Sequence, residues 1–184
     1  MRILAERSGQ QLVYSNLAGD LGVAADTVIR WVDLLGRLHC GLVVRPWFAN
    51  IAKALRKEPK WFLRDWSGIK DDGALTETLL ACHLFTAVEG WTDLGFGEFD
   101  LRYLRDKQKR EVDFLMVKDQ VPWFLVEAKT SDTHLSSSLA YFQAQTRAPH
   151  AMQAVLTLPY EPVDGFTADR PVVVPARTLL SQLL

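Results

Sequence analysis

The sequence predicts an α+β protein, with an N-terminal winged helix-turn-helix followed by an α/β domain that has a mixed central sheet. Three observations support this fold class. Residues 15–38 carry apolar side chains at helical spacing on both sides of Gly22. From residue 100 onward, short apolar runs of strand length replace that pattern. Between them, residues 66–73 (WSGIKDDG) are rich in turn formers, which predicts a boundary between residues 1–66 and residues 72–184.

The first 40 residues are expected to be helical. Ser15 can cap a short helix that Gly22 ends, and a second helix follows with apolar residues at Val28, Trp31, Val32 and Leu35. Two short helices around a glycine turn are typical of a helix-turn-helix, whose second helix would offer Arg30 to the edges of DNA bases. Such pairs are also common packing units, so DNA binding and simple packing both stay open.

A basic window follows these helices. Two strand-like pieces, residues 42–45 and 61–64, can form the wing, and between Arg45 and Arg64 the sequence has a single acidic residue, Glu58. We expect phosphate contacts in this window, and the candidates are Lys53, Arg56, Lys57 and Lys60. A solvated loop would explain the same charge, so that alternative stays open.

The second part mixes helices and strands. Residues 74–90 predict a helix that carries Glu77 among apolar neighbours and ends at Gly90. Pro175 can begin a terminal helix, and another helix is expected over residues 136–146. Strands are expected over residues 91–96, 100–105, 111–117, 122–129, 152–158 and 171–174.

Two of these strands carry carboxylates. Because side chains alternate along a strand, Asp113 is expected to share a face with Leu115, and Glu127 is expected to share a face with Lys129. If the polar turn at residues 118–120 joins the two strands as an antiparallel pair, Asp113 and Glu127 converge at one end of the sheet. Carboxylates so close repel each other unless a cation neutralises them, and oxygen ligands suit Mg²⁺ or Mn²⁺.

Lys129 adds a catalytic group to this pair. An ammonium beside a metal-bound water can lower the pKa of that water or stabilise charge on a phosphate under attack. Asp113, Glu127 and Lys129 are therefore the candidate catalytic residues for metal-assisted phosphodiester hydrolysis. The candidate phosphate contacts just upstream are Arg105, Lys109 and Arg110. An isolated E-x-K is more often a salt bridge at a sheet edge, so the interpretation depends on Asp113 and on Glu77.

A resemblance to a known family lies in five stretches, which are LAERSGQQLVYSNLAGDLGVAADTVIRWVDLL, PWFANIAKALRKEPKWFLRDWSG, LTETLL, REVDFLMV and FLVEAKTSD. Through them the chain resembles the C-terminal half of a bacterial and archaeal family of predicted AAA-type ATPases. That half joins a winged-helix segment to a restriction-endonuclease-like, PD-(D/E)xK, domain. The resemblance implies that Glu77, Asp113 and Glu127 are metal ligands and that Lys129 is the catalytic lysine.

Two positions depart from the family pattern. Thr78 follows Glu77 where Asn is expected, and Ala128 stands within E-x-K where Val is more usual. Neither change removes a ligand side chain. A third departure is larger, because no G-x-x-x-x-G-K-[ST] motif occurs, so we expect neither ATPase activity nor an organic cofactor.

The resemblance implies a Mg²⁺- or Mn²⁺-dependent nuclease, or a nuclease-like nucleic-acid-binding domain of an ATPase-associated protein. The alternative is a catalytically inactive module that binds DNA, regulates an AAA-type ATPase or docks on one. The formal net charge of -1 means that affinity for nucleic acid must come from local patches. DNA is the favoured partner, and an ATPase domain in trans and a second copy of the chain are the others considered.

The sequence also predicts a location. Its apolar runs fall far short of the roughly 18 residues that a membrane span requires. Its two cysteines are too few for a disulfide scaffold and fit a reducing compartment. We therefore expect a cytoplasmic protein without a membrane partner.

Overall fold

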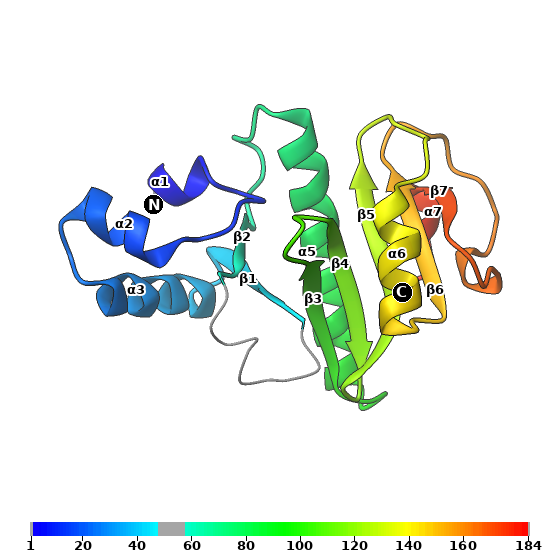
Figure 1. The fold of residues 1–184 in the computed structure, drawn as a ribbon, viewed down its shortest axis with the longest axis horizontal. Coiled ribbons are helices and arrows are strands. Elements are labelled where there is room, and N and C mark those ends of the chain that lie inside the picture. The colour runs from blue at the N-terminus through cyan, green and yellow to red at the C-terminus, as the bar shows by residue number, and fades with distance from the viewer. Residues whose placement is uncertain (1, 48–57, 184) are drawn as a thin grey trace.

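The structure, a computed structural model, describes residues 2–47 and 58–183. Within these residues the chain is a mixed α+β protein with six α-helices and one seven-stranded mixed sheet. The N-terminal helices lie at one end of the sheet, and the later helices cover its faces (Figure 1).

Three helices form the N-terminal part: α1 (Arg2–Ala5), α2 (Tyr14–Leu21) and α3 (Ala25–Arg37). Gly22 ends α2 in the left-handed conformation, with φ at 66°, as the break in the sequence pattern predicts. The N-cap residue of α2 is Val13, so Ser15 lies inside the helix and does not cap it. Val28 and Val32 are buried as expected, but Trp31 is 46% exposed. The outer face of α3 therefore carries an unburied aromatic residue.

The two strands expected as a wing are present, and they belong to the sheet. β1 (Gly41–Pro46) pairs antiparallel with β2 (Lys60–Leu63) and parallel with β3 (Phe99–Arg105). Trp61 of β2 is fully buried and packs with the N-terminal helices, in a cluster with Leu12, Leu17, Val28 and Val32. The N-terminal part is thus joined to the rest of the chain through strand pairing and not by a linker alone.

The long helix α5 (Asp72–Asp93) is capped at its N-terminus by Asp71, whose carboxylate accepts a hydrogen bond from the backbone N–H of Ala74 at 2.7 Å. The expected end at Gly90 is wrong, and so is the expected strand over residues 91–96. The helix continues to Asp93, and Thr92 donates a hydrogen bond to the carbonyl of Val88 at 2.9 Å within it. The chain then turns at Gly95, whose φ is 79°.

The remaining elements follow the expected order. β3, β4 (Glu111–Lys118) and β5 (Val121–Lys129) form an antiparallel meander, and α6 (Ser137–Thr146) then crosses over to β6 (His150–Val155), which is parallel to β5. A 3-10 turn, η1 (Gly165–Thr167), precedes β7 (Val172–Pro175). Pro175 is the residue before α7 (Ala176–Ser181). The strand order is β2-β1-β3-β4-β5-β6-β7.

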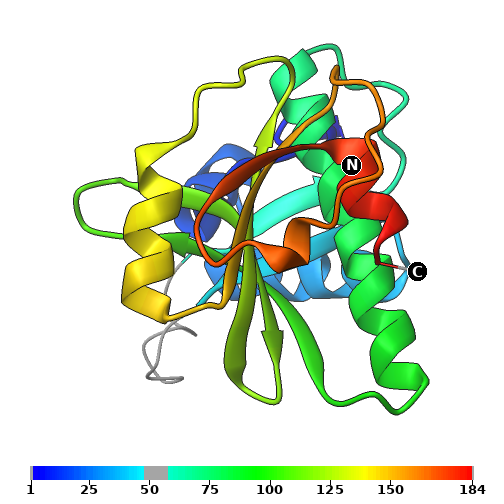
Figure 2. The ribbon, with the colours of Figure 1, turned by 90° about the vertical axis from the view of Figure 1, so that its right-hand side faces the viewer.

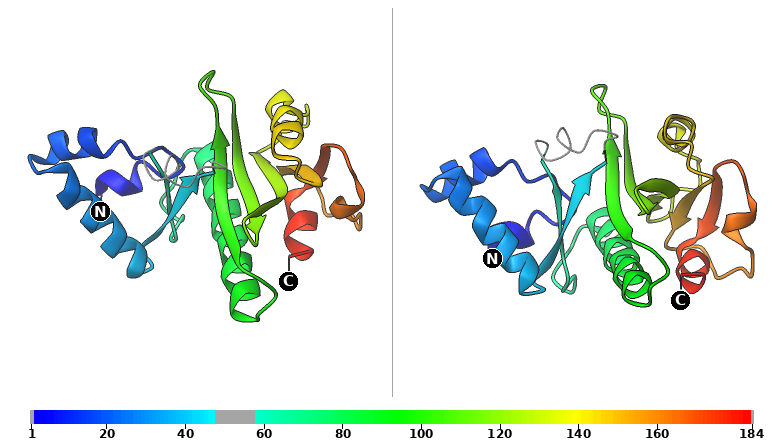
Figure 3. Two further views of the ribbon diagram at one scale, coloured as in Figure 1. Left: turned by 60° about the horizontal axis from the view of Figure 1, so that its bottom comes forward. Right: turned by 90° about the horizontal axis from the view of Figure 1, so that it is seen from below.

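The central strands are covered on both faces. α5 and α7 pack on one face, and α6 packs on the other (Figures 2 and 3). The α5 side includes Phe114, Met116 and Val126, and the α6 side includes Leu115 and Leu125. A charged side chain at this level of the sheet must therefore find partners inside the protein, because water is largely excluded.

The pairing of β3 with β4 contains an irregularity that changes the face of the sheet on which one side chain of β4 lies. Arg102 pairs with Leu115 and Leu104 pairs with Val112, so β4 has one more residue than β3 in this interval. Strict alternation predicts that Asp113 lies on the same side as Leu115. That expectation is wrong, because Asp113 contacts β2 on the α5 side. The irregularity is what turns its carboxylate toward α5.

Close packing at Gly41 makes a testable prediction. A Cβ at residue 41 would lie 2.2 Å from the Trp61 ring and 2.7 Å from the Phe62 carbonyl oxygen. Gly41→Ala is therefore expected to lower the free energy of unfolding by about 2 kcal/mol, as measured by urea denaturation. Gly36→Ala is the matched control, because the space around residue 36 in α3 is open, and it should raise stability by about 0.5–1 kcal/mol. Equal effects of the two substitutions would contradict this account of Gly41.

Candidate functional site

The site begins where β4 and β5 part. Their pairing runs from Lys118 and Val121 to Phe114 and Val126, and it stops there. Asp113 lies one residue beyond the last pair, Phe114 with Val126. Its carboxylate Oδ2 accepts the backbone N–H of Ala128 at 2.9 Å, in place of a backbone carbonyl of β4. This hydrogen bond fixes Asp113 against the strand that carries Glu127 and Lys129. Asp113 thus lies beside the E-x-K segment, although it does so from the α5 side and not through the face expected from the sequence.

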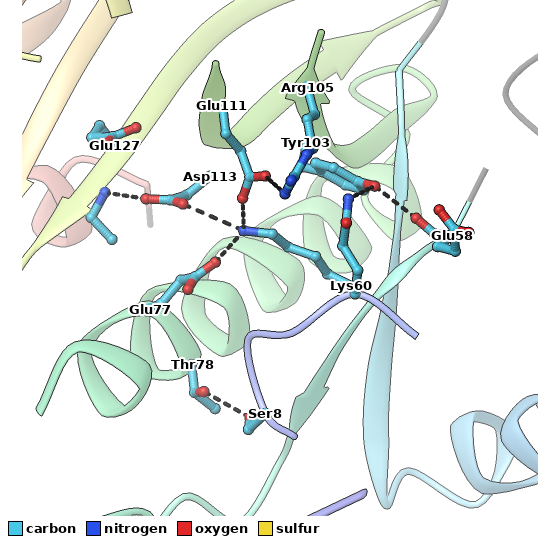
Figure 4. A network of polar contacts seen from close by, with 12 residues as sticks. Ser8, Glu58, Lys60, Glu77, Thr78, Tyr103, Arg105, Glu111, Asp113 and Glu127 are labelled. Carbon is cyan, nitrogen blue, oxygen red and sulfur yellow. Dashed lines mark hydrogen bonds and ion pairs between the residues drawn. The ribbon is translucent and has the colours of Figure 1, made fainter. Parts of the chain in front are cut away.

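Glu77 approaches the same point from α5. Its Oε1 lies 2.6 Å from the ammonium nitrogen Nζ of Lys60, and that nitrogen is 3.4 Å from Asp113 Oδ1. A third carboxylate, Glu111, lies 2.6 Å from Nζ through its Oε1 (Figure 4). Lys60 is only 3% exposed, so one buried ammonium holds three acidic residues from two elements.

This position of Lys60 corrects an expectation. It is among the basic residues expected to contact phosphate, but its side chain is directed into the protein, and its three N–H donors face carboxylates. The neighbouring groups support the charge. Arg105 Nη1 binds the second oxygen of Glu111 at 2.7 Å, and the Tyr103 ring centre lies 5.6 Å from Lys60 Nζ.

Glu127 and Lys129 form the outer side of the cluster. Lys129 Nζ donates to Glu127 Oε1 at 2.8 Å, and the lysine side chain is 33% exposed. The Glu127 side chain is 9% exposed, and its Oε2 is buried with no hydrogen-bond partner in the described part of the chain. A buried carboxylate oxygen without a donor is costly, so this atom has capacity for a cation.

The charges of the cluster are unbalanced, and the pKa values reflect this. Burial and the charge of Asp113 raise the pKa of Glu77 to about 8, against the opposing effect of Lys60. Burial and Asp113 also raise the pKa of Glu127 to about 7, although Lys129 opposes this. Burial alone would lower the pKa of Lys60, but the surrounding carboxylates outweigh it and raise that pKa, so the ammonium stays charged.

The donor set of the cluster fits a metal ion only in part. In residues 2–47 and 58–183, no group of three or more His, Cys, Asp or Glu side chains is arranged to hold one. The Lys60 ammonium contacts both Glu77 and Asp113, at 2.6 and 3.4 Å. The chemistry of the donors nevertheless suits a divalent ion, since Glu127 Oε2 is buried and unpartnered and the expected ligands are carboxylate oxygens.

The N-terminal residues line the inner wall of the cluster. Gly9 has φ at 81°, and a Cβ there would lie 3.0 Å from Glu77 Oε2. Next to it, Ser8 Oγ lies 2.8 Å from Thr78 Oγ1 and accepts the N–H of Leu63 at 3.0 Å. Thr78, which departs from the family pattern, thus ties α5 to the N-terminal part.

Gln153 is a site-supporting residue that the sequence analysis did not identify. It is fully buried in β6, and its backbone pairs with Glu127. Its side-chain amide donates to the carbonyls of Asp132 and His134 at 3.0 Å and accepts the N–H of Ser136 at 2.9 Å. It therefore holds the loop that follows E-x-K. A buried polar residue within the apolar run AMQAVL is the signal that could have indicated it.

Of the expected nucleic-acid contacts that the structure describes, Lys60 and Arg105 belong to the cluster through Glu111. Arg30 and Lys109 are exposed. Arg105 is paired with Glu111, and Arg110 is paired with Asp106 and lies 3.7 Å from the Tyr141 ring centre. The other candidates, Lys53, Arg56 and Lys57, lie outside the described residues.

The fold and the site define an α+β domain with a carboxylate and lysine cluster at the point where two antiparallel strands separate. Residues 72–179 match the family described as Domain of unknown function (DUF4143), and residues 1–69 match Domain of unknown function (DUF8612). The first match covers more than half of the chain, which therefore belongs to the DUF4143 family.

The curated relatives are longer than this chain. Rv2008c of Mycobacterium tuberculosis and Mb2031c of Mycobacterium bovis, both described as uncharacterized proteins, are each 32% identical to it over 150 residues. The aligned part is 74% of this chain and 33% of each relative, so the chain spans about a third of the length of the curated relatives it matches. No solved structure gives a significant match. None of the helices in the described ranges is long and apolar enough to cross a membrane.

The raised pKa values predict how stability depends on pH. In the unfolded chain both glutamates have ordinary pKa values near 4.5, so the folded state binds more protons between that pH and about 8. The free energy of unfolding should therefore fall as pH rises from 5 to 8, by on the order of 2 kcal/mol. Chemical denaturation in chelator at several pH values measures this. Glu127→Gln should flatten the slope, and a slope unchanged in that variant would contradict the assignment.

Proposed function

We propose that the chain is a nuclease-like domain whose cluster of Glu77, Asp113, Glu127 and Lys129 serves metal-assisted hydrolysis of phosphodiesters in nucleic acid. The observation that carries this proposal is the convergence of these four side chains from α5, β4 and β5. Ordinary packing gives no reason to bury several carboxylates together, since each loses hydration and repels the others.

The order of the elements gives further support. A helix with Glu77 precedes the meander, Asp113 lies at the end of its second strand, E-x-K ends its third strand, and a helix follows. This is the order through which the chain resembles the PD-(D/E)xK domains. The proposal therefore includes that fold for residues 72–184 and a winged helix for residues 1–66.

Each residue has a separate task in the proposed mechanism. Asp113, Glu127 and Glu77 would hold a Mg²⁺ or Mn²⁺ ion, which when bound supplies an activated water and neutralises charge on the phosphate. The N–H of Ala128 orients Asp113, and Glu127 offers Oε2, which has no other partner. Lys129 is exposed on one side, so its ammonium can donate to a phosphate oxygen while it keeps its contact with Glu127.

DNA is the proposed substrate, and exposed basic residues are the proposed contacts to its backbone. Arg30 on α3 and Lys109 before β4 are free of ion-pair partners within the described residues, whereas Arg105 and Arg110 would have to exchange theirs. The relatives are about three times as long as the aligned part. Because the chain resembles the C-terminal half of predicted AAA-type ATPases, we propose that an ATPase domain in trans acts with it in the cytoplasm.

A second candidate function is a nucleic-acid-binding or docking module without catalysis. One observation favours it, namely that Lys60 already neutralises Glu77 and Asp113 from within the protein. In this alternative the carboxylates are structural and no divalent ion binds.

The two candidates give different results in a cleavage assay. The chain is incubated with plasmid DNA and with single-stranded RNA, in Mg²⁺, in Mn²⁺ and in chelator. Metal-dependent cleavage is expected, and it should fall at least about 100-fold in Asp113→Asn and in Lys129→Met, because each loses a group that acts on the reacting atoms. Lys70→Met, which removes an exposed charge that is neither in the cluster nor among the expected phosphate contacts, is the control.

The absence of cleavage would be interpreted with calorimetry. If neither Mg²⁺ nor Mn²⁺ binds and the wild type cuts no substrate, the nuclease proposal is wrong. Salt-dependent DNA affinity would then identify a binding module, and no affinity for DNA would leave docking on a protein.

A further inference from the structure

We propose that Lys60 is a tethered cation that competes with the divalent ion for Glu77 and Asp113, and that Glu111 is the carboxylate to which its ammonium withdraws when the ion binds. This inference rests on the proposed function, because it concerns the occupancy of the same site. It assigns a regulatory role to a residue of β2, which lies outside the part of the chain that matches the DUF4143 family.

Lys60 uses the carboxylate oxygens that a metal ion at this site requires. Its Nζ donates to Glu77 Oε1 at 2.6 Å and to Asp113 Oδ1 at 3.4 Å. Both carboxylates are proposed metal ligands. A divalent cation and an ammonium so close together would repel strongly in a site with little water, so occupancy by one weakens occupancy by the other.

With all of its acids ionised, as metal binding requires, the cluster lacks one positive charge. Four acids, Glu77, Glu111, Asp113 and Glu127, meet three bases, Lys60, Lys129 and Arg105. The remaining deficit lies with Glu127, whose side chain is nine-tenths buried and whose Oε2 has no partner in the described residues. A ligand of positive charge is therefore expected at the Glu127 side, next to the oxygens that Lys60 occupies.

Lys60 has one acidic partner that it can keep when a metal ion binds. Glu111 Oε1 lies 2.6 Å from Nζ, and Glu111 is not among the proposed metal ligands. Its other oxygen is held by Arg105 at 2.7 Å, so this carboxylate is fixed in place. When the ammonium leaves Glu77 and Asp113, it can retain the ion pair with Glu111 and remain neutralised inside the protein.

The test is calorimetric titration of the full chain with Mn²⁺ and with Mg²⁺. Lys60→Met keeps the length of the side chain and removes the charge, so metal affinity should rise at least about 10-fold over the wild type. Glu111→Gln removes the partner to which Lys60 withdraws, so affinity should fall by about 5-fold. Lys70→Met is the control, because it removes an exposed lysine, and affinity should not change.

A double variant separates competition from a simple change in net charge. If Glu111 acts through Lys60, then Lys60→Met with Glu111→Gln should bind metal about as tightly as Lys60→Met alone. The double variant also removes both members of one ion pair. It can therefore be compared with Glu111→Gln if Lys60→Met does not fold, and about 10-fold tighter binding is again expected.

The outcomes distinguish the two proposals. If the wild type binds metal and neither variant without Lys60 binds it more tightly than its reference, the competition is wrong and the metal site stands. If no variant binds either ion, the competition and the proposed nuclease function are both wrong.

Discussion

The contacts of the Lys60 ammonium are the interaction on which the rest of the cluster depends. Glu77, Glu111 and Asp113 lose most of their hydration when the sheet and α5 pack together, and their charges repel one another. A single buried cation at 2.6–3.4 Å from all three makes this arrangement tolerable. The Glu127 carboxylate is left with one buried oxygen, Oε2, that has no hydrogen-bond partner among the described residues, and a bound cation would neutralise its charge.

Much of the second part could be predicted from the sequence because its signals are local. Alternating runs of strand length indicated β3, β4 and β5, and the polar turn between β4 and β5 indicated their antiparallel pairing. From that pairing alone, Asp113 could be placed near Glu127 and Lys129. The end of α5 could not be predicted in the same way, since Trp91 and Leu94 fit a strand pattern as well as a helical one.

Two features of the site depend on contacts between distant residues. The extra residue of β4 opposite β3 turns Asp113 toward α5, and no local pattern records that irregularity. Lys60 lies in a basic stretch, where charge alone suggests solvent. Lys60 lies two residues before Phe62 and therefore shares its face of the strand. Because Phe62 packs against Phe114 at a ring separation of 5.7 Å, this spacing is the signal that Lys60 faces the interior. Using that signal requires knowing that β2 is a strand of the main sheet.

The pairing of β1 with β3 has a consequence for how the chain can be divided. The two family matches meet between residues 69 and 72, yet Arg45 and Pro46 pair with Arg102 and Tyr103 across that point, and the Trp47 N–H bonds to the Tyr103 carbonyl. A fragment beginning at residue 72 would expose unpaired backbone groups on β3, which favour aggregation with other chains. Such a fragment would also lack Lys60, which neutralises the buried carboxylates of Glu77, Glu111 and Asp113. The two matched segments therefore form one structural unit.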